Sequence, residues 1–255
     1  MTLTDNPRGN YRFLSGIAPY SCGVVAMSGY EVVRVRLRHP LPLHGPIFEG
    51  IGRYLSGVGR PMQALCAMEL RIPAPLSFEG FKEINNEYQQ KLKDQGLLLG
   101  EFNPIARTNI APAKFELKEP SVYAFSYTSH ANDGFTLPSF IVAGAGDLID
   151  QTDLTPSAIY RPNETSADAL EEKAGVVMKV MQERLSGLQT DWEAVSNTSI
   201  YTMIPLHTLI VDTILKPMGA AALQGVTWYY SNPPIKGLAF EMDMRGVRKE
   251  LIMEL

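Results

Sequence analysis

The feature that most constrains the fold is an order of sequence patterns that occurs twice along the chain. In the first half, segments with strand and helix periodicity alternate and end in two strands; they are 31–42, 44–59, 63–73, 78–92, 106–112 and 121–128. The second half repeats this order; its segments are 139–149, 167–185, 193–205, 207–219, 225–234 and 237–246. Such a repeat indicates an internal duplication.

Turn-forming residues at 131–138 mark the expected boundary between the two copies. The boundary divides the chain into domains 1–130 and 131–255, and each has about 125 residues, a common domain size. Within the first copy, Ser77 is placed to cap the helix at 78–92. The strand at 31–42 alternates apolar residues with three arginines, which we assign to a solvated face.

Strands that alternate with helices predict an α/β (α+β) fold. Each copy should be a mixed sheet with two helices on one face, closed by a hairpin made of its last two strands. The strands contain long apolar runs, so the second face of each sheet must also be covered. A sheet from the other domain or from another subunit would cover it, and we therefore expect a homo-oligomer.

Composition excludes several classes of partner and cofactor. The net charge is −4 and the chain has no basic block, which argues against nucleic acid. It also lacks an apolar run long enough to span a membrane and an apolar signal segment at the start. Cys22 and Cys66 form no disulfide framework, so we expect a cytoplasmic protein. Its histidines have no metal-ligand spacing and no phosphate-binding loop is present, so we expect neither metal nor organic cofactor.

A single arginine stands out in the segment NPIARTNIAP, residues 103–112. Arg107 is the only charged residue there, and prolines flank the strand. Pairing with a surface acid is one explanation. The other is that the partner of Arg107 belongs to a ligand, because a guanidinium holds a carboxylate through two parallel hydrogen bonds.

Five segments, taken in order, resemble the reactive intermediate deaminase (Rid/YjgF) family; they are GIAPYSCGVVAMSG, FKEINNEYQQKL, PIARTNIAP, IVAGAGDL and GLAFEMDM. Their order and spacing carry the resemblance, which covers nearly the whole chain as two tandem copies. It implies two chorismate-mutase-like domains and assembly as a trimer or a multiple of one, with pockets between subunits. Active members of that family hydrolyse imines or enamines derived from amino acids, without a cofactor, and release ammonia.

The resemblance also implies roles for particular residues. In that family an arginine grips the substrate carboxylate and a glutamate positions water, which makes Arg107 and Glu241 the expected catalytic pair. Matching positions suggest a substrate-binding set; it consists of Tyr20, Asn85, Asn109, Tyr123 and Gly144. For several of these residues a plain structural role is the alternative: a solvated strand face for Glu241, a helix-surface amide for Asn85, and core packing for Tyr20.

The two halves depart from the family pattern in complementary ways. The first half has Arg107, but its closing strand lacks the glutamate and carries Tyr123 instead. The second half has Glu241, but Gly225 or Val226 stands where an arginine is expected. Either one composite pocket draws on both halves, or the deaminase site has decayed.

Three functions follow from this pattern. The first is hydrolytic deamination of small imine or enamine carboxylates, such as 2-aminomuconate-like compounds or 2-imino acids. The second is a non-catalytic binding or regulatory role, and the third is a chorismate-type hydrolase on the same fold. A cavity shared by Arg107 and Glu241 would favour the enzyme, whereas Arg107 without an acid would favour a binder. A chorismate-type site would need a larger apolar cavity and more than one cationic contact.

Overall fold

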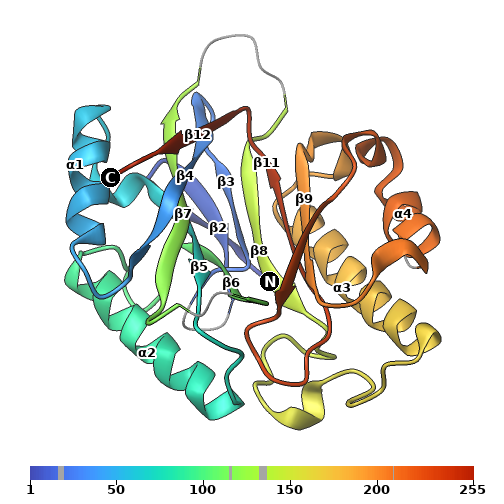
Figure 1. The fold of residues 1–255 in the computed structure, drawn as a ribbon. Helices are drawn as coiled ribbons and strands as arrows, with labels where there is room; N and C mark the ends of the chain where they lie inside the picture. Colours follow the sequence, from blue (N-terminus) through green and yellow to red (C-terminus); the bar gives the residue numbers. More distant parts are fainter. Residues whose placement is uncertain (17–19, 115–116, 132–136, 209) are drawn as a thin grey trace.

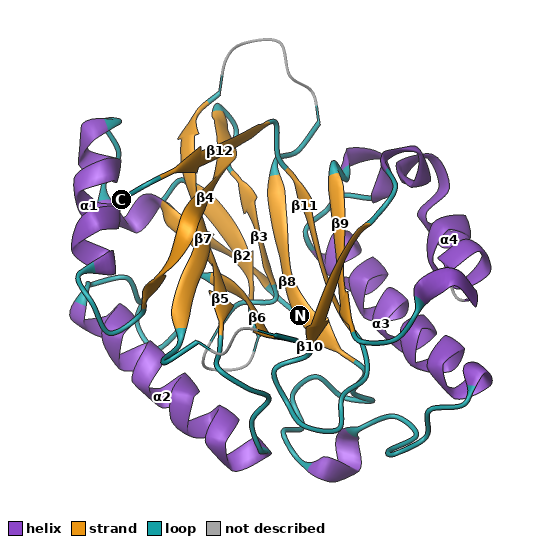
Figure 2. Ribbon diagram, viewed as in Figure 1, coloured by secondary structure: helices purple, strands orange, loops and turns teal. Residues whose placement is uncertain are grey.

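The computed structural model describes residues 1–16, 20–114, 117–131, 137–208 and 210–255. The strands lie between two outer layers of helices, as Figure 1 shows. Helices of the first half cover one side of the molecule and helices of the second half cover the other (Figure 2). The two halves therefore meet through their strands.

All the named strands belong to one hydrogen-bonded sheet of twelve, in the order β1-β2-β3-β8-β11-β9-β10-β6-β5-β7-β4-β12. The strands are β1 Leu3–Asn6, β2 Tyr11–Leu14, β3 Gly23–Ala26, β4 Tyr30–Pro42, β5 Leu65–Arg71, β6 Ala106–Pro112, β7 Ser121–His130, β8 Phe140–Gly146, β9 Asn197–Thr202, β10 Thr227–Asn232, β11 Glu241–Gly246 and β12 Lys249–Met253. Most neighbours are antiparallel; the parallel pairs are β5/β6, β9/β10 and β4/β12. The sheet folds back on itself, so that β6 packs against β8.

The two halves repeat one strand order. It is β6-β5-β7-β4 in the first half and β10-β9-β11-β8 in the second, and β6 joins β10 at the centre. The expected closing hairpins are wrong, because β5 lies between β6 and β7, and β9 lies between β10 and β11. The physical reason is that the helical crossover makes β5 and β6 parallel neighbours. The other edge of β6 is taken by β10, so β7 pairs with the other edge of β5.

The outermost strands cross the boundary expected at residue 130. Strands β1, β2 and β3 pair in succession, and β3 then pairs with β8 of the second half, although all three belong to the first half in sequence. The last strand, β12, pairs with β4 of the first half. Sequence patterns did not predict β1, β2 or β12, which are short segments at the ends of the sheet.

Helices cover the outer face of each half of the sheet. The helices of the first half are α1 Ile47–Gly57 and α2 Phe78–Asp94; those of the second are α3 Ala167–Gly187 and α4 Lys216–Met218, the latter preceded by a π-helical turn at Ile210–Leu215. Ser77 caps α2 as predicted, accepting a hydrogen bond from the Gly80 backbone N–H at 3.1 Å. Each helix buries its apolar stripe against the strands behind it.

The strand faces that point away from the helices are covered by the opposite half of the same chain, since β4 and β6 contact β8 there and one buried cluster contains residues of both halves. Arg34, assigned from the sequence to a solvated face, is in fact only 2% exposed. Its Nε and Nη2 donate to the two carboxylate oxygens of Glu69 at 2.6 and 2.7 Å. Burial alone would raise the pKa of Glu69, but Arg34 more than offsets this and lowers it to about 2. A second subunit is therefore not needed to cover this face.

The helices of the described residues are all too short or too polar to cross a lipid bilayer.

Candidate functional site

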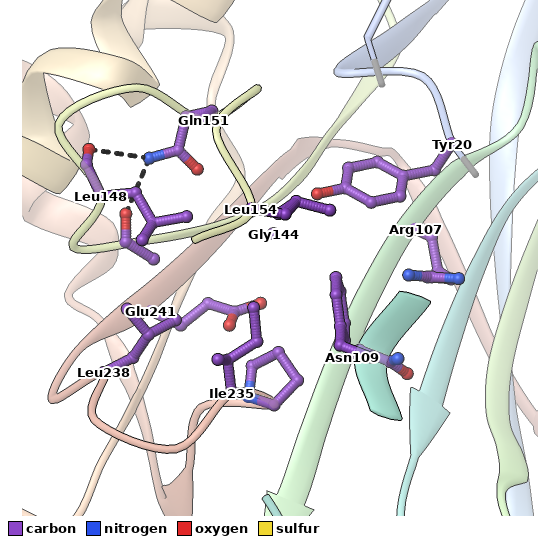
Figure 3. A pocket seen from close by; sticks show the side chains of 13 residues that line it. Tyr20, Arg107, Asn109, Gly144, Leu148, Gln151, Leu154, Ile235, Leu238 and Glu241 are labelled. Carbon is purple, nitrogen blue, oxygen red and sulfur yellow. Dashed lines mark hydrogen bonds between the residues drawn. The ribbon is translucent and has the colours of Figure 1, made fainter. Parts of the chain in front are cut away.

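A cavity lies where the first half of the chain meets the second. Strand β6 and helix α2 border it on one side, and β8, β11 and two loops of the second half border it on the other (Figure 3). Its lining residues are Tyr20, Phe81, Arg107, Asn109, Gly144, Gly146, Leu148, Gln151, Leu154, Pro234, Ile235, Leu238 and Glu241. The cavity has about 30 Å³ of space for water. The apolar lining residues come mainly from the two loops, so movement of these loops would enlarge it.

Arg107 enters the cavity from β6 and is 3% exposed. Its Nη2 donates to Oδ1 of Asn85 on α2 at 2.6 Å. Its Nε and Nη1 have no hydrogen-bond partner among the described residues. The guanidinium carbon lies 4.9 Å from the ring centres of Tyr20 and Tyr88, and 5.7 Å from that of Phe81. Thus aromatic rings and one amide hold the guanidinium while two donor atoms stay available.

The environment of Arg107 decides between the two explanations of its lone charge. No acid of the described chain forms an ion pair with it, so pairing with a surface acid is wrong. Burial lowers the pKa of Arg107, and nearby tyrosines and Glu241 act in the opposite direction. Since an arginine stays charged in proteins, a buried guanidinium with free donors is costly without an anion or water beside it.

Glu241 enters the same cavity from the start of β11 and is 4% exposed, so the solvated strand face is wrong for this residue. Burial raises the pKa of Glu241 well above the ordinary carboxyl range, and the charge of Asp243 raises it further. Arg184 and Arg107 pull the pKa of Glu241 in the other direction. Its carboxyl group therefore holds a proton to higher pH than an ordinary carboxyl group does.

Gly144 on β8 leaves the space that the Glu241 side chain occupies. A Cβ atom at position 144 would overlap Oε1 of Glu241 and would lie 3.1 Å from Cγ2 of Thr108. The backbone here is held from behind, because Nη1 of Arg184 donates to the carbonyl oxygens of Ala143 and Gly144 at 2.8 and 3.1 Å. The strand therefore cannot withdraw easily to admit a side chain.

We expect Gly144→Ala to fold normally but to displace the Glu241 carboxyl from the cavity. The carboxyl is the end of a flexible side chain and can rotate, whereas the Cα of Thr108, 3.3 Å from the added methyl, is backbone and yields less. A crystal structure of the variant would show the new Glu241 rotamer, and thermal unfolding would report the cost. An unmoved Glu241 carboxyl would contradict the prediction. Gly175→Ala is the matched control, because its added methyl meets no atom within 4 Å.

Most of the substrate-binding set predicted from the sequence meets at this cavity. Tyr20, Asn109 and Gly144 line it together with Arg107 and Glu241, and the Tyr20 hydroxyl points toward its centre (Figure 3). Asn85 does not line the cavity but is 3% exposed and holds Arg107, so the helix-surface interpretation is wrong. The fifth residue, Tyr123, lies elsewhere.

Tyr123 is not among the residues that line the cavity. Its ring lies under the guanidinium of Arg71, whose central carbon is 3.8 Å from the ring centre. The reason is the strand order: Tyr123 lies on β7, and β5 separates β7 from β6. The resemblance placed Tyr123 in the site because it stands where the first half lacks a glutamate.

Sequence reasoning missed a buried ion pair that holds the backbone next to Glu241. Nζ of Lys173 donates to Oδ2 of Asp147 at 2.8 Å, and the two side chains are 1% and 0% exposed. The other oxygen, Oδ1 of Asp147, accepts hydrogen bonds from the backbone N–H groups of Ala239 and Phe240 at 2.9 and 3.1 Å. The signal was present in the sequence, because Lys173 falls on the apolar stripe of its helix, next to Ala174.

In the described part of the chain, no three His, Cys, Asp or Glu side chains are arranged to hold a metal ion.

Comparisons with known proteins give the site a chemical context. The model of a family described as 2-aminomuconate deaminase CnbZ matches residues 3–251. A 2-amino-5-chloromuconate deaminase of Comamonas testosteroni is 34% identical over 245 residues, which are 96% of each chain. A chorismatase crystal structure superimposes with a TM-score of 0.51 and 9% identity, over 88% of this chain and 77% of the other. The last likeness concerns the fold alone.

Proposed function

Since the chain belongs to the 2-aminomuconate deaminase CnbZ family, we propose that it hydrolyses 2-aminomuconate-like enamine or imine carboxylates and releases ammonia. The observation that supports this most is the shared cavity, to which the first half contributes Arg107 and the second half contributes Glu241. A composite pocket was one explanation for the complementary departures of the two halves from the family pattern, and the shared cavity supports that explanation. The match at family level covers both contributing strands.

Substrate binding rests on Arg107. Nε and Nη1 are its free donors, and each shares an edge of the guanidinium with Nη2, which has a second N–H besides the one donated to Asn85. A carboxylate can therefore bind in a bidentate way through Nη2 together with either Nε or Nη1, whichever edge Asn85 leaves open. The third contact of the guanidinium, with Asn85, fixes its orientation before substrate arrives. The carboxylate next to the enamine carbon would thus be held in a defined position opposite Glu241.

Glu241 positions the attacking water. The enamine first takes its imine form, which presents an electrophilic carbon. The carboxylate of Glu241 accepts a proton from water as the water oxygen bonds to that carbon, and the resulting acid returns the proton to the nitrogen. The carbon–nitrogen bond then breaks as the new hydroxyl group gives its proton back to the Glu241 carboxylate, so that ammonia leaves and a 2-oxo acid remains. A carboxyl group with a raised pKa suits both the acid and the base step.

The proposed chemistry needs no cofactor, since a protonated imine is already electrophilic. Metal analysis and an absorption spectrum of the purified protein would test this. Stoichiometric metal or a bound flavin would contradict it.

The two alternative functions receive less support. A non-catalytic binder would not require an acid opposite the arginine, yet Glu241 lines the cavity. A chorismate-type hydrolase would need a second cationic contact, and Arg107 is the only cation among the described lining residues. The chorismatase likeness, at 9% identity, does not change this balance.

The decisive test is an assay of the purified protein with 2-aminomuconate, following ammonia release. Wild type should be active, Arg107→Ala should lose substrate binding, and Arg107→Lys should keep the charge but lose the paired contact. We expect a KM increase of about tenfold or more for Arg107→Lys, since each charge-assisted hydrogen bond contributes about 1.5–3 kcal/mol. Absence of ammonia release by the wild type would rule out the proposed activity.

The pH profile should report the raised pKa of Glu241. Folding favours the protonated carboxyl, so the stability that this group contributes is present below its unfolded pKa and is lost as the pH rises through the folded pKa. Water attack uses the opposite form, so kcat/KM should increase with pH, with an inflection above the ordinary value of 4.5. Asp243→Asn should move this inflection to lower pH, because the charge of Asp243 raises the pKa of Glu241. An inflection that stays in place would contradict the assignment.

We also propose that the two halves are tandem YjgF-like domains, 1–130 and 131–255, and that the family shares an origin with Rid/YjgF proteins. The repeated strand order supports this. We further propose assembly as a trimer or a multiple of one, and a cytoplasmic location, which agrees with the two buried free thiols. Light scattering that showed a monomer at micromolar concentration would contradict the proposed assembly.

A further inference from the structure

Asn109 is the other polar residue that β6 presents to the cavity. Asn109 is only 3% exposed, and neither Oδ1 nor Nδ2 of its side chain has a hydrogen-bond partner among the described residues. Buried amides are nearly always bonded in folded proteins. An amide with both ends unpaired, facing a cavity, therefore points to a polar group supplied by a ligand or by water.

The position of Asn109 relative to Arg107 sets the kind of ligand. The two residues are two apart on one strand, so their side chains leave the same side of β6 about 7 Å apart. Both positions are fixed by the parallel pairing with β5, where Arg107 lies opposite Met68 and Asn109 opposite Leu70. A rigid pair of donors at this spacing suits a molecule with an anionic group at each end.

The other amide in the cavity cannot take this role. Nε2 of Gln151 donates to the carbonyl oxygens of Gly146 and Leu148 at 2.8 and 3.1 Å. Figure 3 shows both hydrogen bonds. Only the Oε1 acceptor of Gln151 is left, and an acceptor repels a carboxylate. Apolar side chains, among them Leu154 and Ile235, form the wall between the polar groups and suit a hydrocarbon chain.

We propose that Asn109 binds the distal carboxylate of a dicarboxylate substrate, while Arg107 binds the carboxylate beside the enamine nitrogen. Asn109 is thus the residue that makes the site prefer dicarboxylates to monocarboxylates. The inference rests on the proposed function and goes further by assigning the far end of the substrate. Nδ2 donates to the carboxylate, and Oδ1 accepts from a water molecule that enters with it.

An uncharged amide at position 109 is also less costly to bury than a charged side chain when no ligand is bound. A second buried cation would add a large desolvation cost when no ligand is bound, whereas an amide carries no net charge. The present volume of about 30 Å³ holds water only, so the loops carrying Leu154 and Leu238 must withdraw when the ligand enters. The strand that carries both binding residues does not need to move.

The test compares the binding of two unreactive dienes by calorimetry. trans,trans-Muconate has a carboxylate at each end, and sorbate has the same diene with one carboxylate. Wild type should bind muconate at least about tenfold more tightly than sorbate. Asn109→Leu should abolish that preference and leave sorbate affinity within about twofold. Asn109→Asp, which keeps the shape, should weaken muconate binding further through charge repulsion.

Tyr20→Phe is the comparison variant, because the Tyr20 hydroxyl also points into the cavity. It should retain the muconate preference. Equal affinity of the wild type for both dienes would overturn the inference, as would a preference lost in Tyr20→Phe and kept in Asn109→Leu. These binding measurements need no turnover, so they are independent of the ammonia assay. Absence of ammonia release would contradict the proposed function. Normal ammonia release without a preference for muconate over sorbate would contradict only the role of Asn109.

Discussion

Glu241→Gln is expected to lower kcat for ammonia release by about 10²–10⁴-fold, the usual contribution of a general acid or base. Glutamine fills the same space beside Gly144 but can neither accept a proton from water nor return one to nitrogen. Binding of the substrate carboxylate should persist, because Arg107 is unchanged. Steady-state kinetics would give kcat, and calorimetry with muconate would report binding.

Glu83→Gln is the matched control. Glu83 is exposed on α2, so the substitution makes the same chemical change away from the cavity. Its kcat should equal that of the wild type. If Glu241→Gln retained more than a tenth of wild-type kcat, another group would have to activate the water, and the assignment of Glu241 would be wrong.

Lys173→Met is expected to cost about 3–5 kcal/mol of folding free energy, because removal of one partner leaves a buried charge uncompensated. Asp147 would remain fully buried without its ion-pair partner. The same carboxylate holds the backbone N–H groups that precede Glu241, so the loss should loosen the edge of the cavity as well. Chemical denaturation monitored by circular dichroism would measure the change.

Two further variants separate the buried charge from the loss of a lysine. Lys179→Met changes an exposed residue of the same helix and should alter stability by less than about 0.5 kcal/mol. Combining Lys173→Met with Asp147→Asn should recover part of the loss, since asparagine keeps an acceptor for the two N–H groups without a charge. A double variant as unstable as Lys173→Met alone would contradict this account.

The sequence predicted strands and helices well because their periodicity is local. The segment 78–92 shows both its cap and its apolar stripe, and the structure confirms α2 there. The order of strands in the sheet depends on which edges remain free after each crossover, which periodicity does not record. That is why the predicted closing hairpins were wrong. The edge strand β12 is short and half polar, and its pairing with distant β4 has no local signal.

The site could be predicted in part for a similar reason. Arg107 stood out because no acid lies near it in sequence, and the structure places it in a cavity with Glu241. Burial of Arg34 was missed because alternation along a strand does not reveal what covers each face. Lys173 was missed because its partner, Asp147, is 26 residues away and on another element.

The division of one cavity between the two halves of the chain has a consequence for how such a gene can change under the proposed tandem origin. A duplicated unit begins with redundancy, so each copy can lose what the other retains. Once Arg107 remains only in one copy and Glu241 only in the other, neither copy can be deleted or restored to independence by a single substitution. The exchanged terminal strands reinforce this, since each half completes the sheet of the other. If the halves arose by the proposed duplication, a dispensable second copy has thus become an obligatory partner within the same polypeptide.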